Sequence, residues 1–300
     1  FIISIVKVKN NKIALIIMAV LNLSIIYNSV FWGQVDGIHS LFIFLAFYFT
    51  VNRKWHFVGL FFTLAFFTKI VSIVFLPVLG LYILNETLCR RFGKKDLIII
   101  TLTVIISSLI LSLPIILSGS FSEVWATHKG FIAAYNTVSG NAYNVWVLLV
   151  SDKNLASVET SEYFFRGITY QTLGLSMFVF FYSLSISPLI YSIYKNLKNG
   201  TKNPIKIETL LYACILVPLV FFYFSTKIRE RYAHPYLVFI TLYCFYNRRY
   251  IFWFLATSIY FLQLESVLQY TKTLPQVFSH FHTKTSIYSP TLISGLFLSL

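Results

Sequence analysis

Long apolar runs alternate with short polar segments along the whole chain. The runs are continuous rather than alternating residue by residue, so they predict helices and not the strands of a porin-like barrel. Several are shorter than the roughly 20 residues that a helix needs to cross a bilayer. Short or broken helices usually border a polar cavity within the membrane. The runs lie at about 13–31, 38–51, 57–68, 70–84, 97–118, 170–194, 207–225, 235–247, 250–268 and 287–300.

The composition agrees with a membrane protein. Hydrophobic residues make up 57% of the chain and charged residues 11%, whereas a soluble domain carries about 25% charged residues. Mean hydropathy is +0.75. We expect an all-α fold: a polytopic transmembrane helical bundle with short broken helices around an outward-facing cavity. It forms a single transmembrane domain over 1–300 with about ten membrane segments. The chain starts at Phe1 inside an apolar run, which predicts that N-terminal spans are missing.

The basic residues predict an orientation. If each run crosses the membrane once, fifteen of the 24 lysines and arginines fall in one set of loops and nine in the other. The positive-inside rule places the richer set in the cytoplasm. The net charge of +14 therefore reflects cytoplasmic loops, and no nucleic-acid partner is expected. Keeping the cluster 90–95 on that side requires a hairpin over 57–84 with Lys69 at its outer tip. The chain is rich in Lys, Ile, Asn and Phe, which suggests an AT-rich genome and a bacterial cytoplasmic membrane.

Two polar islands interrupt the apolar runs, at Trp32–Gly37 and Lys227–Pro235. A charged residue at the centre of a bilayer costs about 2.5–3.5 kcal/mol, so these islands belong at a membrane edge or in a polar cavity. The longest non-membrane segment, the outer loop 119–169, contains the polar and aromatic stretch Gly140–Trp146. All of these segments, together with Lys69, are predicted to face outward.

The acidic residues of the islands are the candidate catalytic groups. Asp36 can act as a general base towards a substrate hydroxyl, or it can cap the helix that begins near Ile38. Glu230 lies between two arginines and can orient one of them, bind a sugar hydroxyl or form a structural ion pair. Glu265, near the end of an apolar run, either meets substrate or is paired within the fold.

The basic, amide and aromatic residues of the same segments are the candidate substrate-binding groups. Arginine offers planar, bidentate donors that match phosphate oxygens, although basic residues at helix ends also contact lipid headgroups. Asparagines beside an aromatic face suit a sugar, although an interfacial tryptophan is as often a membrane anchor. The three cysteines show no pairing or metal motif, and no metal or cofactor is expected. The candidates are Gln34, His39, Lys69, Asn141, Asn144, Trp146, Arg229, Arg231, Tyr232 and His234.

Four motifs in this order resemble those of one class of membrane enzymes. They are Trp32-Gly33-Gln34-Val35-Asp36, Thr68-Lys69 followed by Phe75-Leu76-Pro77, Asn141-Ala142-Tyr143-Asn144-Val145-Trp146, and Lys227 to Pro235. The chain is similar to the GT-C membrane glycosyltransferases, near the bacterial proteins related to GPI mannosyltransferases and glycosyltransferase family 87. Arg229 stands where that family often has histidine, which weakens a histidine role there and makes a phosphate contact easier.

The resemblance implies a function. The donor is expected to be a polyprenyl-phosphate-linked sugar, and a mannose-like hexose moves with inversion to a glycan, lipid or protein acceptor on the non-cytoplasmic side. Similar enzymes carry an acidic residue in the first outer loop, which here is expected to precede Phe1. Asp36 is then a second acid of the site.

Two other functions fit the same sequence. A transporter or a flippase for lipid-linked sugars also has broken helices and a cationic cavity, but it is expected to carry polar residues through the membrane depth and inverted repeats. The other alternative is a non-catalytic membrane scaffold.

Overall fold

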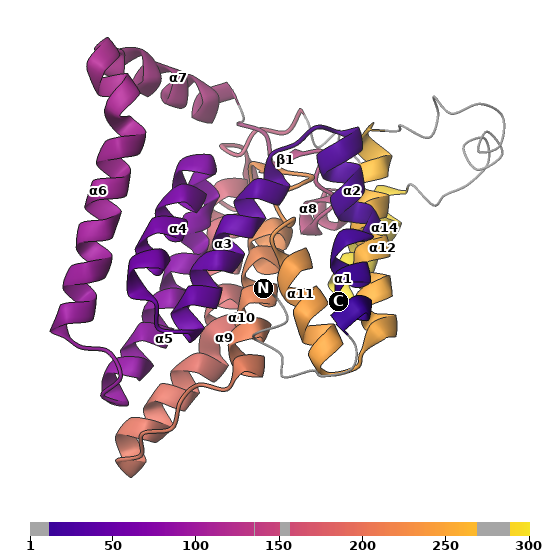
Figure 1. Ribbon diagram of the computed structural model, residues 1–300. Helices are drawn as coiled ribbons and strands as arrows, with labels where there is room; N and C mark the ends of the chain where they lie inside the picture. Colours follow the sequence, from indigo (N-terminus) through magenta and orange to yellow (C-terminus); the bar gives the residue numbers. More distant parts are fainter. Residues whose placement is uncertain (1–11, 135, 151–156, 269–288) are drawn as a thin grey trace. The chain divides into compact units, whose positions relative to one another are not determined.

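The computed structural model describes residues 12–134, 136–150, 157–268 and 289–300, and the described chain is predominantly helical. Each of the ten apolar runs coincides with a helix or a broken helix (Figure 1). Five described helices are long and apolar enough to cross a membrane, or six if the bent pair Ile13–Val20 and Leu23–Phe31 is counted as one. The predicted helical fold and the presence of several helices that could span a membrane are confirmed.

The chain divides into two compact units, which we describe separately. The first comprises residues 1–37, 137–182 and 218–300, and the second comprises residues 38–136 and 183–217. Three long helices pass from one unit into the other. They are α3 (Asp36–Val51), α9 (Tyr170–Asn199) and α10 (Ile207–Phe224).

The first unit opens with a broken helix. α1 (Lys12–Val20) is followed by α2 (Leu23–Ile26), and a π-helical turn, η2 (Tyr27–Phe31), completes the segment. The two halves are bent by 40°. Asn22 explains the break, because its side-chain oxygen accepts from the backbone N–H groups of Ser24 and Ile25 at 3.1 and 3.3 Å. An asparagine that caps a new helix in this way satisfies donors that the preceding turn cannot reach.

The rest of the first unit packs around α11 (Tyr236–Tyr246) and α12 (Tyr250–Leu268). α12 contacts α2, α11 and α14 (Pro290–Leu298), while α14 also contacts the short α8 (Val145–Leu149). The strands are short: β1 (Ser139–Gly140) pairs in parallel with β4 (Ile228–Arg229), and β2 (Tyr163–Phe165) pairs antiparallel with β3 (Ile168–Thr169). A small apolar core under the loop region includes Val138, Trp146 and Tyr170.

The second unit contains the expected hairpin. α4 (Trp55–Thr68) ends at Lys69, and the chain continues as the 3₁₀ segment η3 (Ile70–Phe75) and α5 (Leu76–Leu88). The two open ends of the hairpin meet, because Arg53 Nε lies 2.7 Å from Glu86 Oε2 and the Trp55 ring packs edge-on against Phe92. Lys69 is therefore at the turn, about 20 Å away along the 14 residues of α4.

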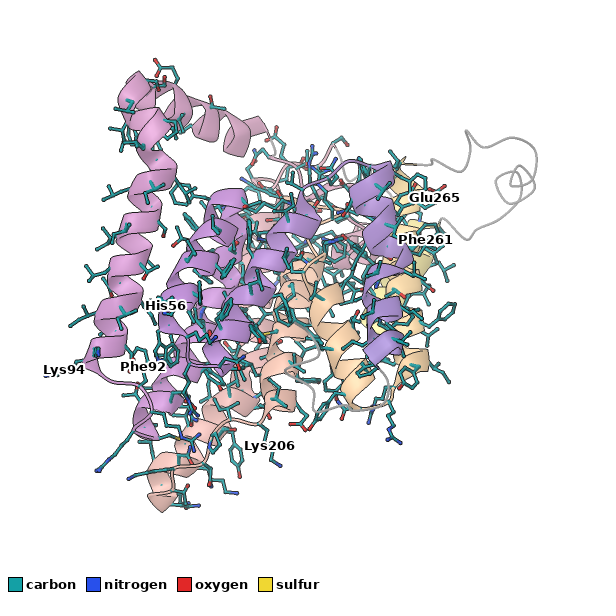
Figure 2. All side chains as sticks on the ribbon, viewed as in Figure 1. His56, Phe92, Lys94, Lys206, Phe261 and Glu265 are labelled. Atoms are coloured by element: carbon teal, nitrogen blue, oxygen red, sulfur yellow. The ribbon has the colours of Figure 1, made fainter. Side chains whose placement is uncertain are left out.

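Basic loops gather at the open end of this hairpin. Asn196 on α9 donates to Asn85 Oδ1 at 2.8 Å and to the backbone oxygen of Asn203 at 2.7 Å. Figure 2 shows Phe92, Lys94 and Lys206 towards the same end of the unit. The loops around 53, 90–95 and 196–206 thus share one end, as they must if they are all cytoplasmic.

α6 (Lys94–Ser118) packs against α4, where Gly59 permits a close approach: a Cβ at Gly59 would stand 3.0 Å from the backbone oxygen of Ile100. Most of α6 is only partly covered by the rest of the chain: 6% of its most apolar window is buried. The helix ends at Gly119, whose φ of 68° suits glycine. α7 (Phe121–Ala134) then turns away from the end of α6 (Figure 1).

Candidate functional site

A tight turn presents the first polar island within the first unit. The backbone N–H of Trp32 donates to Tyr27 O and that of Gln34 to Asn28 O, both at 3.0 Å. Gly33 adopts a φ of 65°, which a residue with a side chain rarely accepts. The turn ends as α3 begins at Asp36, and Asn28 Nδ2 then lies 3.4 Å from Asp36 Oδ2.

The second island and the loop 139–146 meet through β1 and β4. Ser139 pairs with Ile228, and Gly140 pairs with Arg229. A Cβ at Gly140 would lie 3.5 Å from Arg229 Cγ, so the absence of a side chain leaves room for the Arg229 stem. Asn141 continues the pairing with Arg229 and has an exposed side chain. The two motif segments predicted to converge are therefore adjacent.

Arg231 joins the two islands. Its Nε lies 3.7 Å from Asp36 Oδ2, and its guanidinium lies 3.7 Å from Glu230 Oε1. It also lies over the Trp32 ring, 5.9 Å from the centroid, where the face of the indole attracts a cation. The Asp36 and Glu230 side chains are 2% and 4% exposed and Arg231 is 18% exposed, so these charges interact largely away from water.

Burial changes the acid–base chemistry of this cluster. It raises the pKa of Glu230, and the neighbouring Arg231 and Arg229 oppose that shift only in part. Burial also raises the pKa of the Tyr232 hydroxyl. A buried carboxyl with a raised pKa accepts a proton more readily than an exposed one, which is the property required of a general base near neutral pH. The two arginines supply positive charge beside it.

α12 holds all three segments of the cluster. Tyr260 donates from its hydroxyl to the backbone oxygen of Arg231 at 3.2 Å. Gln263 donates to Asn141 O at 3.0 Å and accepts from Tyr143 N at 2.8 Å. The hydroxyl of Tyr27 donates to the buried Glu265 carboxylate, which Figure 2 places on the same helix as Phe261.

Sequence reasoning missed the roles of Tyr27, Tyr260 and Gln263. The available signal was a pair of polar residues, Gln263 and Glu265, inside an otherwise apolar run, where each needs a partner. Glu265 is fully buried and serves as that partner for Tyr27. The structure therefore shows Glu265 paired within the fold.

Asn144 and Trp146 make structural contacts within the first unit. Both are completely buried. Asn144 caps α8 and donates to Phe222 O at 3.1 Å, while the indole N–H of Trp146 donates to Ser225 O at 3.0 Å. His234 is likewise buried, with its ring near that of Tyr260. A sugar contact for these three side chains stays a prediction.

Gln34 stays at the edge of the cluster. It is half-buried, and its side chain donates to Trp32 O at 3.3 Å. His39 and Lys69 belong to the second unit. There His39 Nε2 lies 2.8 Å from Ser72 Oγ, and that hydroxyl donates to the backbone oxygen of Lys69 at 2.8 Å. Their part in substrate binding stays a prediction.

The described residues contain no group of three or more His, Cys, Asp or Glu side chains placed to hold a metal ion. The chemistry available in the first unit is thus a pair of carboxylates, a pair of arginines and an aromatic face. Comparison of the chain with family models, curated proteins and solved structures found no match.

Proposed function

We propose that the protein is a membrane glycosyltransferase of the GT-C type, which moves a mannose-like hexose from a polyprenyl phosphate to an acceptor on the non-cytoplasmic side. The observation that carries the proposal is the cluster in which Arg231 lies between the Asp36 and Glu230 carboxylates and over Trp32. Such a site combines a proton acceptor, a cation for phosphate and an aromatic face for a sugar.

The reaction uses these groups in one displacement. The acceptor oxygen bonds to the anomeric carbon as the bond from that carbon to the phosphate oxygen breaks. The lipid phosphate leaves with the electron pair, and its charge is stabilised by Arg229 and Arg231. Cationic donors in a water-poor site act most strongly on charge that develops in the transition state. The acceptor proton passes to a carboxylate.

Of the two carboxylates, Glu230 is the better suited to accept the proton. Its pKa is raised by burial, whereas Asp36 contacts both Arg231 and Asn28 and so holds the arginine in place.

A lipid donor suits the placement that the basic loops predict. Nucleotide sugars are cytoplasmic, whereas the positive-inside rule assigns the Arg229–His234 segment to the other side. A polyprenyl phosphate enters sideways from the bilayer and leaves its chain among the apolar helices, so the partners are membrane lipid, donor and acceptor.

The test is sugar transfer by the full-length protein in vesicles supplied with a polyprenyl-phosphate hexose. We expect Glu230→Gln to lower kcat by about 10²–10⁴-fold, the usual contribution of a general base, and Asp36→Asn to lower transfer through the loss of Arg231 positioning. The exposed Glu123 and Arg166 provide matched controls, as Glu123→Gln and Arg166→Gln. Unchanged transfer in both Asp36→Asn and Glu230→Gln would remove this assignment.

A flippase for lipid-linked sugars is the second candidate, because the α1–α2 segment is broken at a buried asparagine. Interrupted helices of this kind form substrate sites in transporters. The same vesicles separate the two functions: a flippase moves the labelled lipid across the bilayer and leaves the bond between sugar and phosphate intact.

A further inference from the structure

The turn that joins α11 to α12 (Figure 1) carries two adjacent exposed arginines, Arg248 and Arg249. The backbone N–H of Arg248 donates to Phe245 O at 3.3 Å, and that of Arg249 donates to Cys244 O at 2.7 Å. This is a left-handed helix cap, in which Arg248 has a φ of 56°. Glycine is the usual residue at such a position, because a Cβ is disfavoured there. The backbone alone therefore gives no reason for an arginine.

The second unit contains the same cap twice, after α3 and after α5. Arg53 has a φ of 56° and Arg90 a φ of 57°, and each is followed by a second basic residue. There a carboxylate of the chain itself meets the positive charge. Glu86 Oε2 lies 2.7 Å from Arg53 Nε, and Glu86 Oε1 lies 4.0 Å from Arg91 Nη1. Basic residues at this kind of cap can thus bind an anion, and the second unit supplies that anion internally.

The arginine pair between α11 and α12 has no such carboxylate. The chain has no acidic residue between Glu230 and Glu265. α1, α2 and α14, which pack against these two helices, contain none either. Within the described ranges, neither Arg248 nor Arg249 forms an ion pair. An anion that comes from outside the chain can therefore bind where the second unit uses Glu86.

An open groove of about 540 Å³ lies beside the two arginines, which form part of its lining. A volume of this size is typical of ligand sites. The other lining residues are Tyr250, Ile251, Phe252 and Leu255, on the first turns of α12. Ile251 and Leu255 are one helical turn apart and are 79% and 49% exposed. The groove thus places uncovered apolar side chains directly next to two positive charges.

This lining favours an amphiphilic ligand with an anionic head. A free phosphate can bind the arginines, but it leaves the apolar wall in contact with water. An uncharged acyl chain covers the wall and leaves the arginines without an anion. An anionic phospholipid does both, because its phosphate oxygens accept hydrogen bonds from guanidinium groups and its acyl chain buries apolar surface.

The location also suits a lipid headgroup. α12 is long and apolar enough to cross a bilayer, and a helix that crosses brings its first residue to one membrane surface. Tyr246 and Tyr250 flank the arginines and are exposed, and tyrosine is enriched at membrane surfaces. The positive-inside rule assigns this turn to the cytoplasmic side, where the leaflet carries anionic lipids.

We propose that Arg248, Arg249 and the groove beside them bind one anionic phospholipid of the cytoplasmic leaflet. Its phosphate lies on the arginines, and one acyl chain lies along Ile251 and Leu255. The site is independent of the proposed sugar transfer. Tyr260, which contacts the Arg231 segment, lies about 15 Å further along α12 than the start of the helix.

The test measures the lipid that the purified full-length protein retains in micelles of a neutral detergent. Native mass spectrometry counts bound phosphatidylglycerol and phosphatidylcholine, supplied at equal concentration. Micelles have no charged bilayer surface that attracts every basic residue alike. We expect wild type to retain one phosphatidylglycerol in preference, and Arg248→Gln with Arg249→Gln to weaken its binding about 30-fold, at roughly 5-fold for each arginine. Ile251→Ser should also weaken it, because less apolar surface meets the acyl chain.

Two further variants separate this site from general charge and from structure. Lys94→Gln with Lys95→Gln removes the same charge from another exposed basic pair that does not line the groove, and retention should stay at the wild-type level. Arg248→Gly suits the left-handed backbone, so in lipid-free detergent it should melt no lower than wild type. It should nevertheless bind less phosphatidylglycerol, a combination that a purely structural arginine would not give.

The contrary results are equally clear. Equal retention of the two lipids by wild type overturns the proposal, as does unchanged phosphatidylglycerol binding after loss of both arginines. An equal loss of binding in the Lys94 and Lys95 control would show attraction to positive charge in general. Displacement of the lipid by inorganic phosphate at the same concentration would show an anion site without a lipid groove. These last two results would also overturn it, and none of the measurements depends on sugar transfer.

Discussion

Gln263 provides the sharpest test of how α12 holds the site. One side chain on this helix bonds the backbone oxygen of Asn141 and the backbone N–H of Tyr143, at 3.0 and 2.8 Å. Gln263→Met keeps the length of the side chain and removes both bonds. The change frees the loop that carries Gly140, the residue paired with Arg229.

The expected cost follows from those two bonds. A typical intramolecular hydrogen bond contributes about 0.5–1.5 kcal/mol, and a partner left buried without one costs more. Asn141 is exposed and Tyr143 is half-buried, so water replaces part of the loss. Gln263→Met should therefore lower stability by about 1–3 kcal/mol, and Gln263→Glu by at least as much, since a carboxylate would then face Asn141 O.

A thiol-reactive fluorescent dye measures this loss, because all three cysteines are buried in the folded chain. At about 2–4 °C per kcal/mol, the dye should report a melting temperature lowered by about 2–12 °C. Gln171→Met is the matched control, because Gln171 is exposed on α9. A Gln263→Met variant that melts with wild type, and whose amides at 139–143 exchange no faster, would refute the role assigned to α12.

Three other predictions concern separate features. Burial raises the pKa of Glu230. Below about pH 4 the Glu230 carboxyl is protonated in both the folded and the unfolded wild type, so Glu230→Gln should there match wild-type stability. As pH rises through the pKa of Glu230 in the folded state, wild type must keep a buried carboxylate ionised, so Glu230→Gln should become the more stable of the two proteins. Melting curves in which wild type gains stability relative to Glu230→Gln with rising pH would contradict this. A Cβ at Gly174 would lie 2.9 Å from both Thr226 and Trp146, so Gly174→Ala should lose about 1–3 kcal/mol in denaturation, unlike Gly80→Ala, which has open space. Trp125 is 57% exposed on α7, which follows apolar α6, so lipids brominated near the headgroup should quench its fluorescence. Trp125→Phe should then reduce the total quenching; equal quenching in wild type and Trp125→Phe would place α7 away from the membrane.

The helices were predictable because the apolar runs are long and continuous, and most have a charged or glycine residue next to at least one end. The break at Lys69 was correctly located, since a cation within an apolar run interrupts a span. The bend at Asn22 was not, because a single asparagine in an apolar context does not reveal that its side chain will cap a new helix. Only the structure shows that partnership.

The candidate site was predictable in part. The islands at 32–36 and 227–235 stand out because charges in a membrane protein need polar surroundings, and the structure joins them through Arg231. The structural contacts of Asn144 and Trp146 were not predictable, because amide and indole groups suit a sugar and a structural hydrogen bond equally well. Tyr260 and Gln263 were missed because their partners are backbone atoms far away in the sequence.

The bond between Tyr27 and Glu265 joins residues that are 238 positions apart. Ribosomes add about 5–20 residues per second, so the first helices wait roughly 10–50 s in the membrane before α12 is synthesised. During that interval the Tyr27 hydroxyl lacks its final partner on α12, whereas Asn22 and Asn28 have partners close by in the sequence. A chain that ends before residue 265 cannot form this bond, so the N-terminal helices should be less stably packed in such a truncated chain.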